Sequence, residues 1–259
     1  MVSGGTLNIY SYDDGLHADY GTALDNGETS LGNITISDGV ITIGVYSPTK
    51  STAGGFKMRG GFGGWGGQQE VKGSDAIHAD NTLTITGGTI KVDSAYEGLE
   101  ATYIKIEGGN ITVFATDDGV NAAKKIANNP SVVVSGGYLD VTVPTSGDTD
   151  GIDSNGTYSQ TGGVVIVRGP GSTSGMMGGG AWALDADGTI SVSGGTLVVF
   201  GGIEGGASAS GMTKTVCSSS TVSAGTHTVT VGSDSYTVTL KYSTNGCVVY
   251  SDSGSATLK

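Results

Sequence analysis

Acidic side chains recur at regular intervals along this chain, and their spacing is the first feature that could do chemistry. Glu97 and Asp118 lie 21 residues apart, the same interval that separates Gly88 from Gly109. One column of aligned positions holds Asp14, Asp75, Glu97, Asp118 and Asp150, with Trp182 in the last repeat. Three residues later, a second column holds His17, His78, Glu100, Asn121, Asp153 and Asp185. A fixed period near 20 residues is typical of a solenoid, in which equivalent residues of successive turns lie above one another.

Such stacking predicts a binding site for a hard cation. Side chains on neighbouring turns lie about 4.8 Å apart, where two carboxylates repel by about 3.5 kcal/mol at an effective dielectric constant of about 20. Ca²⁺ relieves this repulsion because it takes about six to eight oxygen ligands from carboxylates, amides, carbonyls and water. The predicted Ca²⁺ ligands are Asp75, Glu97, Glu100, Asp117, Asp118, Asn121, Asp150 and Asp153. The alternative is a solvated acidic face that only keeps the protein soluble.

The two histidines of the second column, His17 and His78, are poor ligands for Ca²⁺. We expect them either to hydrogen-bond along the column or to be ordinary surface histidines. A transition-metal site is disfavoured because the side chains around them offer mostly oxygen and no cysteine.

The repeats also predict the elements that position these columns. Each repeat contains two short segments with alternating apolar and polar residues, as in Leu83–Thr86 and Thr89–Val92, joined by a Gly-Gly pair. Alternation indicates strands with one buried face, and glycine pairs suit sharp corners. About 21 residues are too few for a strand and a full helix. The prediction is an all-β, right-handed parallel β-helix of about seven coils over residues 1–206, with a small C-terminal β-hairpin or capping segment over 207–259.

The net charge and the composition of the chain limit the classes of partner that it can bind. The 259 residues carry a net charge of −12, which disfavours nucleic acid and anionic membranes and favours cations. No apolar run reaches transmembrane length. Cys217 and Cys247 suggest a disulfide in an exported protein, with two buried free thiols as the alternative. The chain opens in the middle of a coil, so we expect a leader, and further coils, to precede it.

A glycine-rich interruption between residues 47 and 73 contains aromatic side chains. Exposed aromatic faces can stack on sugar rings, and the candidates for this role are Phe62, Trp65 and Tyr96. The alternative is a mobile loop whose aromatic residues pack against the coils.

Several motifs together resemble one known family. They are Ser74–Asp80 (SDAIHAD), Ile85–Ile90 (ITGGTI), Ala95–Glu100 (AYEGLE) and Thr116–Ala123 (TDDGVNAA). Over roughly residues 13–202 the chain is similar to a bacterial carbohydrate-binding β-helix family best known from a cellulolytic clostridium. The resemblance implies an exported, Ca²⁺-binding parallel β-helix, similar in shape to pectate lyases. It also implies binding of cellulose and of acidic polymers such as polygalacturonate, without catalysis.

Three functions remain open at this point. The first is a non-catalytic polysaccharide-binding module at the cell surface, in which Ca²⁺ bridges protein and polymer carboxylates. The second is a Ca²⁺-dependent polysaccharide lyase, in which a cationic residue removes a proton next to a uronate carboxyl. The candidates for that base are Lys72, Lys91, Lys105 and Arg168. The third is a structural or adhesive subunit whose open strand edge allows end-to-end self-association.

Overall fold

The computed structural model describes residues 1–259 except 25, 47–72, 148, 172 and 175–179. The described residues form β-strands and connecting turns, with no α-helix among them. The first fifteen strands are β1 (Val2–Ser11), β2 (Leu16–Ala18), β3 (Tyr20–Ala23), β4 (Thr29–Leu31), β5 (Asn33–Val45), β6 (Ile77–Ser94), β7 (Leu99–Phe114), β8 (Val120–Ala122), β9 (Ser131–Val134), β10 (Tyr138–Thr142), β11 (Ile152–Ser154), β12 (Thr157–Arg168), β13 (Thr173–Ser174), β14 (Gly180–Ala181) and β15 (Ile190–Phe200). The last five are β16 (Thr213–Val222), β17 (Gly225–Val231), β18 (Asp234–Leu240), β19 (Thr244–Ser251) and β20 (Ala256–Leu258). The prediction of an all-β protein is confirmed.

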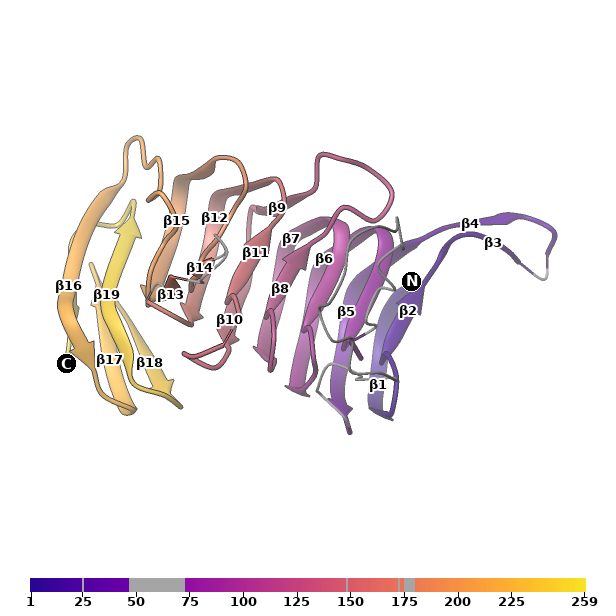
Figure 1. The fold of residues 1–259 in the computed structure, drawn as a ribbon, viewed down its shortest axis with the longest axis horizontal. Coiled ribbons are helices and arrows are strands. Elements are labelled where there is room, and N and C mark those ends of the chain that lie inside the picture. Colours follow the sequence, from indigo (N-terminus) through magenta and orange to yellow (C-terminus); the bar gives the residue numbers. More distant parts are fainter. Residues whose placement is uncertain (25, 47–72, 148, 172, 175–179) are drawn as a thin grey trace, which may run out of the picture.

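Successive repeats lie side by side in parallel register. The main sheet runs β1-β5-β6-β7-β10-β12-β15, and each strand in this series pairs in parallel with the next. Ile41, Ile90 and Ile111 are direct neighbours across three of these strands. Figure 1 shows the result as an elongated stack, with the N-terminus near one end, the C-terminus at the other and the β3–β4 hairpin projecting as an arm.

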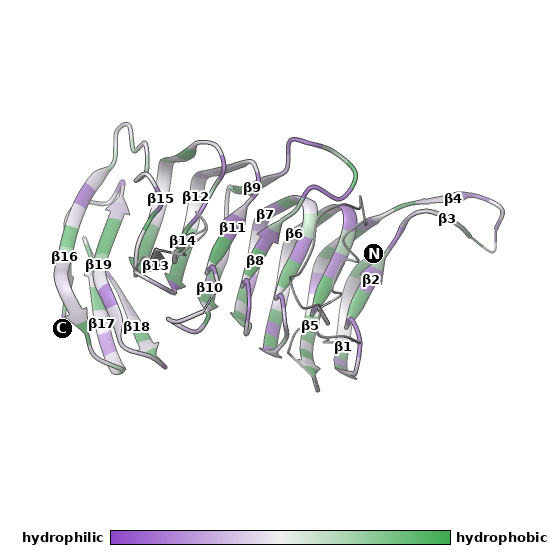
Figure 2. Cartoon of the chain, viewed as in Figure 1, coloured by the Kyte–Doolittle hydropathy of each residue, from purple (hydrophilic) through white to green (hydrophobic). Residues whose placement is uncertain are grey.

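The inward side chains of the stack form one continuous aliphatic core. Leu83, Ile85, Ile104, Ile106 and their counterparts on other strands are fully buried and belong to a single cluster. Their polar neighbours in sequence point outward, so hydropathy alternates along each strand in Figure 2. The buried strand face predicted from the alternation is therefore present, because the two-residue period of a strand places every second side chain inside.

Glycine pairs form the corners for two distinct steric reasons. At Gly108, a Cβ atom would lie 2.4 Å from the carbonyl oxygen of Thr86 on the preceding turn. Its neighbour Gly109 has a φ of +90°, and a Cβ there would lie 3.0 Å from the carbonyl oxygen of Gly87. The first glycine thus permits close stacking of turns, and the second permits the left-handed backbone that turns the corner.

Replacing Gly109 with alanine should therefore destabilise the fold more than replacing Gly211. Both residues have left-handed backbones, which cost an alanine about 1–2 kcal/mol. At Gly109 an added Cβ atom would lie within 4 Å of backbone atoms of the neighbouring turn, whereas at Gly211 it would meet no atom within that distance. An alanine at position 109 would therefore also force two turns apart. Urea unfolding of the two variants measures the difference. Equal losses in the free energy of unfolding would contradict this explanation of the corners.

The C-terminal strands cover the last turn of the stack. Strand β19 pairs antiparallel with β15, and β16 pairs antiparallel with β19. A hairpin is present within the segment 207–259, as β17 and β18. It packs over a second core that includes Ile166, Val198 and Phe200 from the outer face of the stack. The edge of β15 is thus not free to pair with another chain.

Two expectations for the end of the chain differ in detail from the structure. Parallel stacking continues to Ser208, which bridges Ser191, so the last partial turn extends just past residue 206. Cys217 and Cys247 are free thiols that contact each other, in place of the expected disulfide. Burial raises the pKa of both thiols, which disfavours the reactive thiolate. Among the described residues, none belongs to a helix that is long and apolar enough to span a membrane.

Candidate functional site

The backbone places the predicted columns in register. The peptide N–H that follows each leading position donates to the carbonyl of the next leading residue, as from Gly98 to Asp118 and from Gly119 to Asp150. In the second column, Glu100 pairs with His78 on one side and with Asn121 on the other. Asn121 in turn pairs with Asp153. The predicted alignment of acidic side chains on one face is therefore confirmed, and we call this face the acid ladder: Asp14, Asp75, His78, Glu97, Glu100, Asp117, Asp118, Asn121, Asp150, Asp153 and Asp185.

At the N-terminal end of the acid ladder, histidines supply the positive charge. His78 Nδ1 lies 3.0 Å from Asp75 Oδ2 and 2.6 Å from Glu100 Oε2, and Nε2 lies 3.2 Å from Asp80 Oδ1. The ring nitrogens of His17 likewise form hydrogen bonds with the carboxylates of Asp14 and Asp19. The two imidazole rings stack with their centroids 4.5 Å apart. The sequence motif Asp-x-x-His-x-Asp occurs at both positions, and this spacing is the signal from which the arrangement could have been predicted.

The electrostatics indicate that His78 is an imidazolium. Burial alone would lower its pKa, but hydrogen bonds to Asp75 and Glu100 outweigh burial and raise the pKa to about 11. Glu100 is also buried, yet its contacts with His78 and with Lys125 Nζ at 2.7 Å lower its pKa to about 2. Burial raises the pKa of Asp75 to about 7, against the opposing hydrogen bond from His78. Asp75 and Glu100, both predicted Ca²⁺ ligands, thus already have cationic partners.

In the middle of the acid ladder, negative charges crowd together. Oxygen atoms of Glu97, Asp117 and Asp118 lie within 4.8 Å of one another. No described lysine, arginine or histidine forms an ion pair with Glu97 or Asp118. Burial, followed by repulsion from neighbouring carboxylates, raises the pKa of both groups well above its ordinary value. Glu97 and Asp118 therefore lie in a crowded group of carboxylates, and neither of the two has a cationic partner among the described residues.

Asn121 completes the central cluster. Its Nδ2 donates to Glu97 Oε2 at 3.0 Å, while its Oδ1 is buried with no hydrogen-bond partner among the described residues. Asp118 is held in place because its Oδ1 accepts the backbone N–H of Asp150 at 2.8 Å. A buried amide oxygen without a hydrogen-bond partner costs free energy. Together with the three carboxylates, this oxygen forms a set of oxygen donors that suits Ca²⁺. Zn²⁺ and similar ions would favour nitrogen or sulfur donors, which this cluster lacks.

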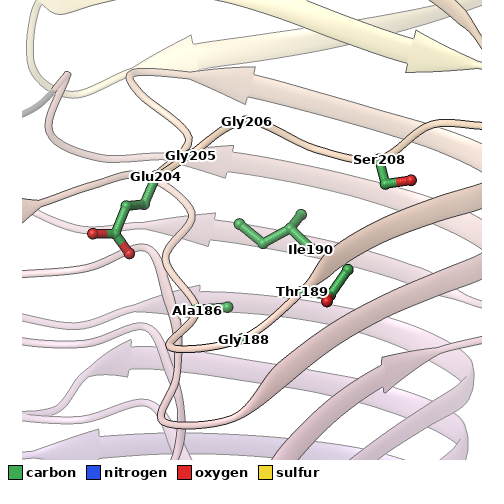
Figure 3. A pocket seen from close by; sticks show the side chains of 8 residues that line it. All are labelled: Ala186, Gly188, Thr189, Ile190, Glu204, Gly205, Gly206 and Ser208. Atoms are coloured by element: carbon green, nitrogen blue, oxygen red, sulfur yellow. The ribbon is translucent and has the colours of Figure 1, made fainter.

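A third group of acids lies beyond the central cluster. Burial, with repulsion from Asp187, raises the pKa of Asp153 to about 6. Burial also raises the pKa of Asp185 to about 8, assisted by a hydrogen bond shared with Glu204. Glu204 lines a pocket of about 420 Å³ near the last turn. In Figure 3, Glu204 and Ser208 lie at opposite ends of this pocket, with Ile190 between them.

The cationic residues considered for a lyase are placed unfavourably for that reaction. Arg168 is 4% exposed, and its guanidinium is held by both carboxylate oxygens of Asp140 and by the carbonyl oxygen of Val141. Lys91 pairs with Asp93 at 2.6 Å. Lys105 is exposed farther along β7 than Glu100, opposite Thr84 and Val133 and outside the acid ladder. Lys72 lies outside the described residues.

Of the three aromatic candidates for sugar stacking, the structure describes only Tyr96, and that prediction is wrong. Tyr96 is 7% exposed, packs against Gly73 and hydrogen-bonds Asp117 through its hydroxyl. A buried ring cannot offer a face to a sugar. The other two candidates, Phe62 and Trp65, lie outside the described residues.

Comparison with known protein families identifies the class to which this chain belongs. Residues 1–119 and 66–255 match a family described as carbohydrate-binding domain-containing protein. Because these matches span most of the chain, the protein belongs to this family. Neither the curated proteins nor the solved structures contain a significant match.

Proposed function

We propose that this protein is a non-catalytic, extracellular polysaccharide-binding protein that uses Ca²⁺ held by the central cluster of the acid ladder. Glu97, Asp117, Asp118 and the Oδ1 atom of Asn121 would hold the ion. The observation that carries the proposal is the uncompensated negative charge of Glu97 and Asp118 next to a buried amide oxygen without a described partner. Family membership supports a carbohydrate as the partner. The parallel stack supports a β-helix architecture, whose right-handed sense is part of the proposal.

Acidic polymers such as polygalacturonate are the ligands that the acid ladder suits best. An acidic protein repels an acidic polymer, so a divalent cation is needed to bridge them. Glu97, Asp117 and Asp118 are only partly buried, so an ion held by them can keep coordination positions open to a ligand from outside. A uronate carboxylate could take such a position. In this role the ion is a bridge and no proton transfer is required.

The two other functions receive less support. For a lyase, none of the described candidates is a free base close to the central cluster, because Arg168 and Lys91 are both engaged in ion pairs. A structural or adhesive subunit would associate end to end through a strand edge. At the C-terminal end that edge is covered by β19. At the N-terminal end of the described main sheet, β1 pairs only with β5 and β2 only with β6, so an open edge is present there.

Binding to polygalacturonate should depend on Ca²⁺ and on the central cluster. We expect sedimentation with insoluble polygalacturonate in Ca²⁺, release by EDTA and rebinding when Ca²⁺ is restored. Glu97→Gln should abolish binding because it removes a central ligand. Glu107→Gln should not, because it changes the net charge equally at an exposed position on β7 outside the acid ladder. Binding that survives both EDTA and Glu97→Gln would refute the bridging role.

A further inference from the structure

Three tyrosines form an exposed aromatic surface at the N-terminal end of the stack. Tyr10, Tyr12 and Tyr46 are 62%, 78% and 59% exposed. The rings of Tyr12 and Tyr46 stack at 4.8 Å with an interplanar angle of 24°, and those of Tyr10 and Tyr46 lie 6.2 Å apart at 43°. We call these three residues the tyrosine platform.

The fold holds the platform in a fixed geometry. Ser11 pairs with Val45, so the residues that follow, Tyr12 and Tyr46, lie side by side on neighbouring turns. The backbone N–H of Tyr46 donates to the carbonyl oxygen of Ser11 at 2.8 Å. Tyr10 faces Gly44, where a Cβ atom would lie 3.2 Å from the Tyr10 ring, so this ring lies close against the sheet surface. Three tyrosines are therefore positioned without being buried, and each keeps more than half of its surface exposed.

Exposed and ordered aromatic rings suit one chemical class of ligand in a protein of this family. A pyranose ring with equatorial hydroxyls has flat faces of C–H groups, which gain dispersion and hydrophobic stabilisation on an aromatic face. The hydroxyl groups at its rim then need polar partners. Lys91 and Asp93 form an ion pair two turns along, and the charge of Lys91 interacts with Tyr10. The platform thus combines apolar faces with a polar rim.

We propose that the tyrosine platform is a second binding site, which takes a neutral β-linked glucan chain without Ca²⁺. This inference rests on the proposed function in that it assumes a carbohydrate partner. It adds that the two sites bind different ligands. Acidic polymers bind at the acid ladder through Ca²⁺, and neutral glucans bind at the tyrosine platform by stacking. Because the two sites use different residues and different physical interactions, they can be lost separately.

The test is affinity electrophoresis of the full chain in gels with hydroxyethyl cellulose, in EDTA. The wild type should be retarded, and Tyr12→Ala should weaken its affinity by about tenfold, since one aromatic contact contributes about 1.4 kcal/mol. Tyr12 is the most exposed of the three, so its loss should leave the melting temperature nearly unchanged. Tyr12→Phe should bind like the wild type, because it keeps the ring. Tyr20→Ala is the matched control, as Tyr20 is 53% exposed but lies on the β3–β4 arm.

The outcomes separate this inference from the proposed function. The platform is overturned if Tyr12→Ala, and the triple variant with Tyr10→Ala and Tyr46→Ala, retain full affinity for the glucan, or if the wild type shows none. It is also overturned if the variants change only the oligomeric state in sedimentation, since the surface would then contact a second copy. In each of these cases Ca²⁺-dependent binding to polygalacturonate is still measured independently. Conversely, the platform is supported if Tyr12→Ala loses the glucan and keeps polygalacturonate.

Discussion

Replacing His78 with glutamine is expected to destabilise the protein by about 3–5 kcal/mol, the cost typical of removing one partner from a buried ion pair. The imidazolium faces Asp75, Asp80 and Glu100, and two of these carboxylates are almost completely buried, at 5% and 4% exposed for Asp75 and Glu100. Glutamine can still donate hydrogen bonds but carries no charge. Lys125 would then be the remaining cation beside Glu100. Urea unfolding in EDTA at pH 7 measures the loss.

The pH dependence distinguishes this role from that of an ordinary histidine. Because the pKa of His78 is raised from 6.5 to about 11, its contribution to stability is complete below pH 6.5 and is lost only as the pH rises towards 11. The difference between wild type and His78→Gln should therefore persist at pH 8. His227→Gln is the control, since the ring of His227 contacts a backbone carbonyl and no carboxylate among the described residues. A difference below about 0.5 kcal/mol, or one that vanishes between pH 6 and 7, would contradict the role of His78.

Neutralising the central cluster is expected to have opposite effects in the presence and absence of Ca²⁺. In EDTA, the variant Glu97→Gln/Asp118→Asn should melt at a higher temperature than the wild type, because it removes two poorly compensated negative charges. The amide introduced at position 118 keeps an oxygen to accept the Asp150 N–H, so the geometry is preserved. In saturating Ca²⁺ the order should reverse. An ion at a hundred times its dissociation constant adds about 2.7 kcal/mol, or about 5–10 °C, to the wild type only.

The same charges predict how stability varies with pH. A carboxyl group whose pKa is raised in the folded state stabilises the fold when protonated, and this contribution is lost as the pH rises through the raised pKa. The pKa values of Asp153, Asp75 and Asp185 rise from 3.8 to about 6, 7 and 8. In EDTA, the wild type should therefore lose stability between about pH 4 and pH 8. Added Ca²⁺ should oppose this loss, since the ion binds the ionised forms of Glu97 and Asp118, whose pKa values are also raised in the folded protein.

Differential scanning calorimetry at about pH 5 and pH 8, with EDTA and with Ca²⁺, tests both statements. The matched control is Glu107→Gln, which removes one charge from the exposed surface of the stack and should follow the wild type in all these conditions. If the double variant melts below the wild type in EDTA, the central carboxylates stabilise the apo protein, and the argument from uncompensated charge is wrong.

The repeat made the register predictable. Strand alternation determined which side chains point inward, and the 21-residue interval between Glu97 and Asp118 placed these two carboxylates together. The glycine pairs likewise identified the corners. These features follow from the backbone alone, since every turn must repeat the geometry of the one before it.

Features that depend on contacts between side chains were not predictable in the same way. Lys125 reaches Glu100 from an interruption in the repeats, so no column contains it. The buried state of Tyr96 depends on Gly73, where a Cβ atom would lie 1.8 Å from the Tyr96 ring. Tyr12 and Tyr46 meet across neighbouring turns, outside any motif. The antiparallel pairing of β19 with β15 could not be predicted either, because the sequence does not show which edge of the stack is free to pair.

Isothermal titration calorimetry tests most directly whether the acid ladder binds Ca²⁺ at Glu97, Asp117, Asp118 and Asn121. Protein freed of metal with EDTA and dialysed should give saturable binding of CaCl₂. Glu97→Gln/Asp118→Asn should abolish this binding, and Glu107→Gln should leave it intact. A wild-type protein that gives no heat of binding, and whose melting temperature is the same in EDTA and in Ca²⁺, would contradict the account.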